Sequence, residues 1–320
     1  MSRKHCSIRI LVIRSGAIGD VVVTLPALKA LREHYADAHL ETMGYPQTLE
    51  LLRGRYYADA VTSIDQAGMG RFYLPDSTLP DALVRYFASF DLILAYVRDP
   101  DGVFQENLRR TGAKQVLCFD PFPRPPRRIP MTHHTCEALI PLGIHAKDMK
   151  PKLHPSPSDK TFAEQFWNNH SLDDPPNQWI VALHPGSGNA AKSWPARHFV
   201  RLTRWLIRTD NAKILLVSGP ADSLPVQTML GALMGMPVLL VHGLALPQLA
   251  ALLQRCNAFV GSDSGVTHMA AAVGTPTIAV FGPTDPQVWG PRGKSVHIVK
   301  IEDWNQASRA ADLSAGVGKV

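Results

Sequence analysis

Short apolar runs alternate with amphipathic stretches along most of the chain, which is the pattern of a parallel α/β protein. The first run, residues 8–14, is β-branched and apolar and predicts a buried strand, and SGAIG (15–19) follows it as a turn. From Asp20 to about His34, apolar residues recur at helical spacing. Pro26 falls inside this pattern, so we expect it to end the first turn or kink the helix.

The same alternation predicts further strands in both halves of the chain. In the first half, strands are expected at 39–43, 91–96 and 114–118. After residue 177 the expected strands are 179–184, 213–218, 238–241, 258–261 and 277–281, with helices at 195–208, 226–234, 247–255 and from about 265.

Between the two halves the regular pattern weakens. A proline-rich, basic loop opens the stretch 119–144, and the second proline-rich stretch, 151–160, is the predicted linker. A length of 320 residues also favours two domains. We therefore expect an N-terminal domain at 1–155 and a C-terminal domain at 156–320, whose last helix packs back on the N-terminal domain.

Composition narrows the class of protein. Hydrophobic residues make up 45% and charged residues 19%, which predicts a packed core. The net charge of +6 suits an anionic small substrate or an anionic membrane surface, and nucleic acid is not expected because no basic motif or aromatic platform appears. Four isolated cysteines indicate a reducing, cytoplasmic compartment. No apolar run approaches the roughly 18 residues of a membrane helix.

The first candidate site is SGAIGD (15–20), directly after the first strand. It lacks the G-x-G-x-x-G spacing of dinucleotide-binding loops. Asp20 at the start of a helix is explained by a role as its N-cap. The functional alternative is a general base, since a helix N-terminus keeps a carboxylate ionised.

The second candidate is HPGSGNAAKSWP (184–195). Its small residues, Ser187 and Gly188 among them, let backbone amides point at an anion, and Lys192 adds a compact positive charge. A tight turn with a solvated lysine explains the same residues, and both interpretations stay open.

The third candidate is GSDSGVTH (261–268), between a strand and a helix. Amides at the helix start and the hydroxyl of Ser264 suit an anion, whereas Asp263 suits sugar hydroxyls or a helix cap. His268 lies one turn into the helix. A proline- and glycine-rich loop, 281–293, follows the next strand. Several anion-suited turns, each after a strand, together predict a site for a nucleotide diphosphate.

These motifs resemble glycosyltransferase family 9, the heptosyltransferases of lipopolysaccharide inner-core assembly. The resemblance is carried by SGAIGDVVVTLPALKALR, HPGSGNAAKSWP, SGPAD (218–222) and GSDSGVTHMAAAVGTPTIAVFGPTDP, from residue 8 to about 293. It implies a GT-B architecture, in which two Rossmann-like domains face each other across a cleft. It also implies a metal-independent, inverting transfer of heptose from an ADP-sugar to a lipid-linked Kdo or heptose hydroxyl, without a cofactor.

The resemblance also implies roles for individual residues. Asp20 matches the family's general base, and Lys192 matches the lysine that contacts the donor's phosphate and sugar. The remaining donor-binding matches are Ser187, Gly188, Asp222 (for the ribose), Asp263, Ser264, Gly265 and His268.

An anionic lipid acceptor would explain several arginines in the N-terminal half of the chain. We expect Arg53, Arg55, Arg124, Arg127 and Arg128 to bind its phosphates and carboxylates, or to contact the inner leaflet of the cytoplasmic membrane, although a solvated surface explains them as well. The protein is expected to be a monomer.

Three alternatives to heptosyl transfer remain at this stage: another nucleotide sugar or acceptor, a nucleotide-sugar epimerase, or a binding protein without activity. Adjacent His133 and His134 are a poor metal pair, and no metal site is expected.

Overall fold

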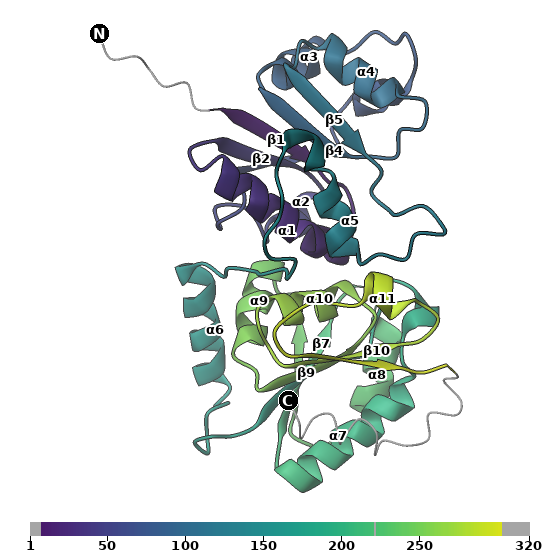
Figure 1. Cartoon of the computed structure of the whole chain (residues 1–320). Coiled ribbons are helices and arrows are strands. Elements are labelled where there is room, and N and C mark those ends of the chain that lie inside the picture. Colours follow the sequence, from purple (N-terminus) through teal and green to yellow (C-terminus); the bar gives the residue numbers. More distant parts are fainter. Residues whose placement is uncertain (1–7, 221, 303–320) are drawn as a thin grey trace. The chain divides into compact units, whose positions relative to one another are not determined.

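In the computed structural model, which describes residues 8–220 and 222–302, the chain forms two compact units, Met1–Met149 and Lys150–Val320 (Figure 1). Each unit is a parallel sheet covered by helices, so the predicted α/β class is confirmed. The units divide after Met149, whereas the sequence predicted a boundary after residue 155. Residues after 302, where the expected last helix falls, lie outside the described part of the chain.

The first unit contains a five-stranded sheet in the order β3-β2-β1-β4-β5. The chain runs outward from β1 through β2 to β3 and then returns to place β4 on the other side of β1. This reversal is a topological switch point, and in open α/β sheets ligands bind beside it at the carboxyl ends of the strands. The strands are β1 (Arg9–Ile13), β2 (His39–Gly44), β3 (Ala60–Ser63), β4 (Leu92–Tyr96) and β5 (Gln115–Phe119).

The helix after β1, α1 (Ile18–His34), runs continuously through Pro26. The prediction that Pro26 would end the first turn is therefore wrong. Proline removes one helical hydrogen bond, and nearby the hydroxyl of Thr135 donates to the carbonyl of Val23 at 2.9 Å. Thr135 lies on α5, which packs on α1. The other helices of this unit are α2 (Pro46–Leu49), α3 (Asp81–Ala88), α4 (Val103–Arg110) and α5 (Met131–Glu137).

The second unit contains a six-stranded sheet in the order β11-β10-β9-β6-β7-β8. Here the chain runs outward from β6 to β8 and returns to place β9 on the other side of β6, so the switch point lies between β6 and β9. The strands are β6 (Ile180–His184), β7 (Lys213–Ser218), β8 (Val238–His242), β9 (Ala258–Ser262), β10 (Thr277–Phe281) and β11 (Val296–Lys300).

The predicted linker is partly helical. Ser156 caps α6 by accepting from the amide of Asp159, and Pro157 suits the first helical position, so the last residues of the 151–160 stretch belong to a helix. A hydrophobic core joins α7 and α8 to one face of the second sheet. The helices are α6 (Pro157–Asn169), α7 (Ala196–Asp210), α8 (Ser223–Ala232), α9 (Leu246–Gln254), α10 (Gly265–Ala272) and α11 (Pro286–Trp289).

No helix among the described residues is both long and apolar enough to cross a bilayer.

Candidate functional site

Asp20 lies at the carboxyl edge of the first sheet, in the first turn of α1. Its Oδ2 accepts a hydrogen bond from the amide of Ala17 at 2.9 Å, which makes it the third residue of the helix rather than its N-cap. The turn before it needs glycine, because a Cβ on Gly16 would lie 2.7 Å from Asp20 Oδ2. The interpretation of Asp20 as the N-cap is therefore wrong, because Ala17 holds that position. The Asp20 side chain nevertheless caps the Ala17 amide, and this bond occupies one side of the carboxylate.

Arg14 follows β1 and holds the other side of Asp20. Its Nη2 lies 3.1 Å from Asp20 Oδ1, and its Nε donates to the hydroxyl of Thr24 at 3.2 Å. The guanidinium carbon lies 5.8 Å from the ring centroids of both Tyr96 and Phe122. Burial lowers the pKa of Arg14 and the charge of Asp20 opposes that shift, so the arginine stays cationic.

The two members of this ion pair differ in exposure. The Arg14 side chain is 4% exposed and the Asp20 side chain 21%. At this edge the Asp20 carboxylate is therefore exposed to solvent, and the Arg14 guanidinium that balances its charge is buried.

In the second unit, the loop after β6 is fastened to the end of β9. The hydroxyl of Ser187 donates to the carbonyl of Asp263 at 2.7 Å, and the amide of Trp194 donates to the hydroxyl of Ser262 at 3.0 Å. Both contacts are buried. They fix the two loops that flank the switch point against each other.

Lys192 and Asp263 form an ion pair at this edge, with Nζ 3.3 Å from Oδ2. The contact is one of proximity, because no well-aligned hydrogen bond among the described residues reaches that oxygen. The lysine side chain is 35% exposed and the aspartate side chain 7%. The Lys192 ammonium is therefore the solvent-exposed member of this ion pair, and the Asp263 carboxylate is the buried one.

Helix α10 starts at the same edge. The Ser264 hydroxyl caps it by accepting from the amide of Thr267. The amides of Gly265 and Val266, in the first turn, have no helical carbonyl to bond and can donate to a ligand. His268 is buried in the helix. Gly188 is exposed at the tip of the loop before Lys192.

His184, the last residue of β6, joins two of these elements. Its Nε2 lies 2.8 Å from Asp222 Oδ2, and its Nδ1 lies 3.1 Å from the hydroxyl of Ser264. All three side chains are buried. The packing is close, since a Cβ on Gly186 would lie 1.7 Å from Asp222 Oδ1.

Asp222 accepts from the amide of Gly219 at 2.9 Å in addition to its contact with His184. Burial alone would raise the pKa of Asp222, but the hydrogen bond and the charge of His184, together with the Gly219 amide, outweigh it and leave that pKa below its usual value. The carboxylate is therefore held as an anion.

The sequence matches the family model described as "Glycosyltransferase family 9 (heptosyltransferase)" over residues 125–316, more than half of the chain. The chain belongs to glycosyltransferase family 9. It is accordingly a glycosyltransferase, and the resemblance seen in the motifs is confirmed.

Individual relatives are distant from this family 9 chain. It is 24% identical to lipopolysaccharide heptosyltransferase 3 of Escherichia coli K12 over 304 residues, which cover 85% of this chain and 82% of the relative. A lipooligosaccharide heptosyltransferase 2 of Haemophilus influenzae is 34% identical over 128 residues, which cover only 38% and 36% of the two chains. The solved E. coli ADP-heptose lipopolysaccharide heptosyltransferase II superposes with a TM-score of 0.76 at 18% identity, covering 98% and 99%. This superposition shows that the fold is shared.

Two of the predicted acceptor-binding arginines of this family 9 chain lie away from Asp20. Arg53 pairs with Ala58 just before β3 begins, at the amino edge of the sheet, and its Nη2 lies 3.1 Å from Glu50 Oε1. Arg55 donates to the carbonyls of Glu50 and Arg53, both at 2.8 Å. The structure does not bring this pair to the carboxyl edge.

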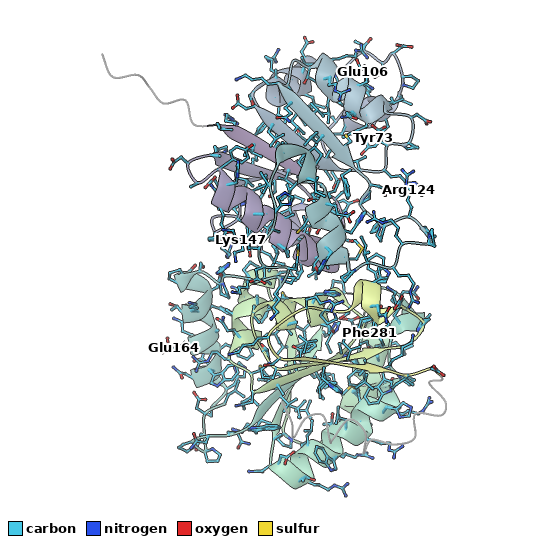
Figure 2. The ribbon with its side chains drawn as sticks, viewed as in Figure 1. Tyr73, Glu106, Arg124, Lys147, Glu164 and Phe281 are labelled. Atoms are coloured by element: carbon cyan, nitrogen blue, oxygen red, sulfur yellow. The ribbon has the colours of Figure 1, made fainter. Side chains whose placement is uncertain are left out.

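The other three arginines follow β5 and so share the carboxyl edge with Asp20. Arg124, on the long loop between β5 and α5 (Figure 2), lies 3.0 Å from Asp120 Oδ2 and is largely exposed. Arg127 makes a bidentate contact with Glu137, at 2.6 and 3.1 Å. Arg128 lies beside it, exposed. Phe122, which lies near the Arg14 guanidinium, connects this loop to the Asp20 pair.

The described residues contain no group of three side chains that could hold a metal ion. His134 is buried, with Nε2 2.8 Å from the carbonyl of Asp120, whereas His133 is exposed. The two adjacent histidines therefore face different surroundings.

Sequence reasoning missed two residues of these edges, Arg14 and His184. Arg14 directly follows β1 and His184 ends β6, and each lies next to a glycine-bearing turn. A charged or titratable residue where a buried strand meets its turn, beside a switch point, was the signal that could have found both.

Proposed function

We propose that this chain transfers heptose from ADP-heptose to a Kdo or heptose hydroxyl of the lipopolysaccharide inner core, with inversion and without a metal ion. The observation that carries the proposal is the opposite charge presented by the two carboxyl edges, a carboxylate at Asp20 and an ammonium at Lys192. The names of the relatives support ADP-heptose as the donor and lipopolysaccharide as the acceptor, and the family resemblance suggests the inner-core hydroxyl. We also propose a cytoplasmic location, in contact with the membrane that carries the acceptor.

On the donor side, the diphosphate would lie between Lys192 and the start of α10. The Nζ charge and the amides of Gly265 and Val266 would stabilise the charge that develops on the leaving ADP. Ser187 and Gly188, in the loop before Lys192, would also contact the donor.

The buried anions of the second unit suit the hydroxyl groups of the donor. Asp222 would accept from the ribose, and Asp263, with His268 one turn further along the helix, would accept from the sugar. Asp263 Oδ2 is a buried atom without a hydrogen bond among the described residues, so it could accept from the sugar once Lys192 turns away from it toward the phosphate.

On the acceptor side, Asp20 would act as general base. The acceptor oxygen attacks the anomeric carbon, the bond from that carbon to the phosphate oxygen breaks, and the acceptor proton passes to the Asp20 carboxylate. Arg14 and the Ala17 amide hold one lone pair on each carboxylate oxygen. The exposed side of the carboxylate is left for the proton.

Arg124, Arg127 and Arg128 remain proposed contacts for the anionic acceptor. Their loop shares the carboxyl edge with Asp20, which favours them over Arg53 and Arg55.

The test is a mass-spectrometric screen of nucleotide sugars against a panel of core-truncated lipopolysaccharides. The proposal predicts an adduct of heptose mass with ADP-heptose and a single truncation class, and NMR of the product should show inverted anomeric configuration. Transfer from a different nucleotide sugar would exclude the donor, isomerisation of ADP-heptose without acceptor would indicate an epimerase, and binding without turnover on any acceptor would indicate a binding protein.

A further inference from the structure

Helix α7 carries a row of arginines on one face. They stand four, three and four residues apart, a spacing that aligns them along one side of an α-helix. All four are exposed, and Asp210 is the helix's single acidic residue. The row consists of Arg197, Arg201, Arg204 and Arg208.

The neighbouring helix, α8, and the turn after it carry no charged side chain and expose several apolar ones. The chain has no Asp, Glu, Lys or Arg between Asp222 and Arg255. Within this uncharged stretch Leu224 is 74% exposed and Met234 is 84% exposed, and Met236 is exposed as well. Met234 and Met236 lie close together in the turn after α8, and Leu224 lies at the start of that helix. Exposed apolar side chains that lie together mark interaction sites.

The basic row and the apolar residues are adjacent. Helices α7 and α8 pack together over one face of the second sheet (Figure 1). Arg204 Nη2 donates to the carbonyl of Ala232, the last residue of α8, at 2.9 Å, and Met234 follows two residues later. A guanidinium has five N–H donors, so this bond leaves others for a ligand. We call the four arginines with Leu224, Met234 and Met236 the α7–α8 flank.

We propose that the α7–α8 flank binds the surface of an anionic lipid bilayer. Arginines bind lipid phosphates, while methionine and leucine side chains insert at the boundary of the acyl chains. Nucleic acid would use the arginines but has no place for three exposed aliphatic side chains. The inference assigns a surface to the membrane contact proposed above and rests on that proposal, but it does not depend on the identity of the donor.

The test is co-sedimentation of the full chain with vesicles of phosphatidylglycerol and phosphatidylcholine, compared with vesicles of phosphatidylcholine alone. Binding should require the anionic lipid and weaken as salt is raised. Each arginine near the surface is worth about a fivefold factor in binding. Arg204→Glu with Arg208→Glu should therefore weaken binding by roughly 25-fold or more, and Met234→Asp by roughly tenfold.

The matched control is Arg109→Glu with Arg110→Glu on α4, which changes the net charge equally on an exposed helix of the first unit. Thermal unfolding checks that every variant is folded, and turnover on a delipidated acceptor in solution should be unchanged. The proposal is overturned by equal binding to both kinds of vesicle, by full binding of the flank variants, or by an equal loss in the α4 control. A wild-type dimer in sedimentation velocity that Met234→Asp dissociates, without vesicle binding, would assign the flank to a second copy instead.

Discussion

In the first unit the buried member of the ion pair at the carboxyl edge is a cation, whereas in the second unit it is an anion. Arg14 is 4% exposed behind an Asp20 that is 21% exposed, and Asp263 is 7% exposed behind a Lys192 that is 35% exposed. Both pairs lie beside a switch point, one following β1 and the other joining the loops after β6 and β9. The two edges thus share a topology and differ in the charge they present.

This difference teaches how similar sheets can take different parts in one reaction. A buried partner fixes the geometry of the exposed group and balances its charge, while the exposed group meets the ligand. In the proposed reaction the first edge would offer a proton acceptor and the second a cation for a leaving diphosphate, which are the two groups that an inverting transfer needs.

The largest effect is expected from Asp20→Asn, which removes the charge that the first edge presents. Turnover should fall by about 10²–10⁴-fold, because a general base typically contributes that factor. The dissociation constant for ADP, measured by calorimetry, should stay near the wild-type value and shows that the variant is folded. Turnover close to wild type would remove Asp20 from the mechanism.

Lys192→Ala removes the charge that the second edge presents. Donor binding should weaken by roughly tenfold or more and turnover should fall as well, since the lysine is expected to contact phosphate in both the ground and transition states. Lys160→Ala, on the exposed face of α6, is the matched control and should leave both values unchanged. Unaltered donor affinity in Lys192→Ala would contradict the phosphate role.

The buried side of the first pair is tested by a double-mutant cycle with Arg14→Met and Asp20→Asn. We expect a coupling of about 1–3 kcal/mol in the free energy of unfolding, because the two side chains touch and Arg14 is buried. Urea unfolding of the four proteins measures it. Additive effects would show that the pair does not hold this edge together.

The smallest expected effect concerns Asp222 in the second unit. Its pKa in the folded chain lies below its unfolded value of about 3.9, so its contribution to stability is present above that pH and is lost as the pH falls through the folded pKa. His184→Gln removes the main interaction that lowers this pKa and should make the loss begin at higher pH. Melting temperatures between about pH 3 and about pH 5 measure the shift. In an Asp222→Asn control the shift should vanish, and an unaltered profile in His184→Gln would contradict the role of this contact.

The sequence was most informative where burial is complete. The strands β1, β6 and β10 are apolar at all but one position each, are almost fully buried and were predicted with nearly the observed bounds. In contrast, β3 (AVTS) and β11 (VHIVK) were missed, because both lie at sheet edges, are only partly buried and carry polar residues. Pro26 misled because local propensity argues against a helix that tertiary packing on α5 supports.

The residues of the site were likewise predicted only in part. The motifs identified Ser187, Lys192, Asp263 and Ser264, which the structure brings together at one edge. They did not reveal Arg14 and His184, since a partner's role depends on which side chains the fold places within hydrogen-bond distance. Arginine content alone also grouped Arg53 with Arg124, although the two lie at opposite edges of the sheet.

The most direct test of the account is a crystal structure of the chain with ADP-heptose bound. The account predicts that the diphosphate contacts Lys192 Nζ and the amides at the start of α10, with the Lys192–Asp263 contact lengthened as the lysine turns to the phosphate. A diphosphate bound away from both Lys192 and the residues 263–265 would contradict it.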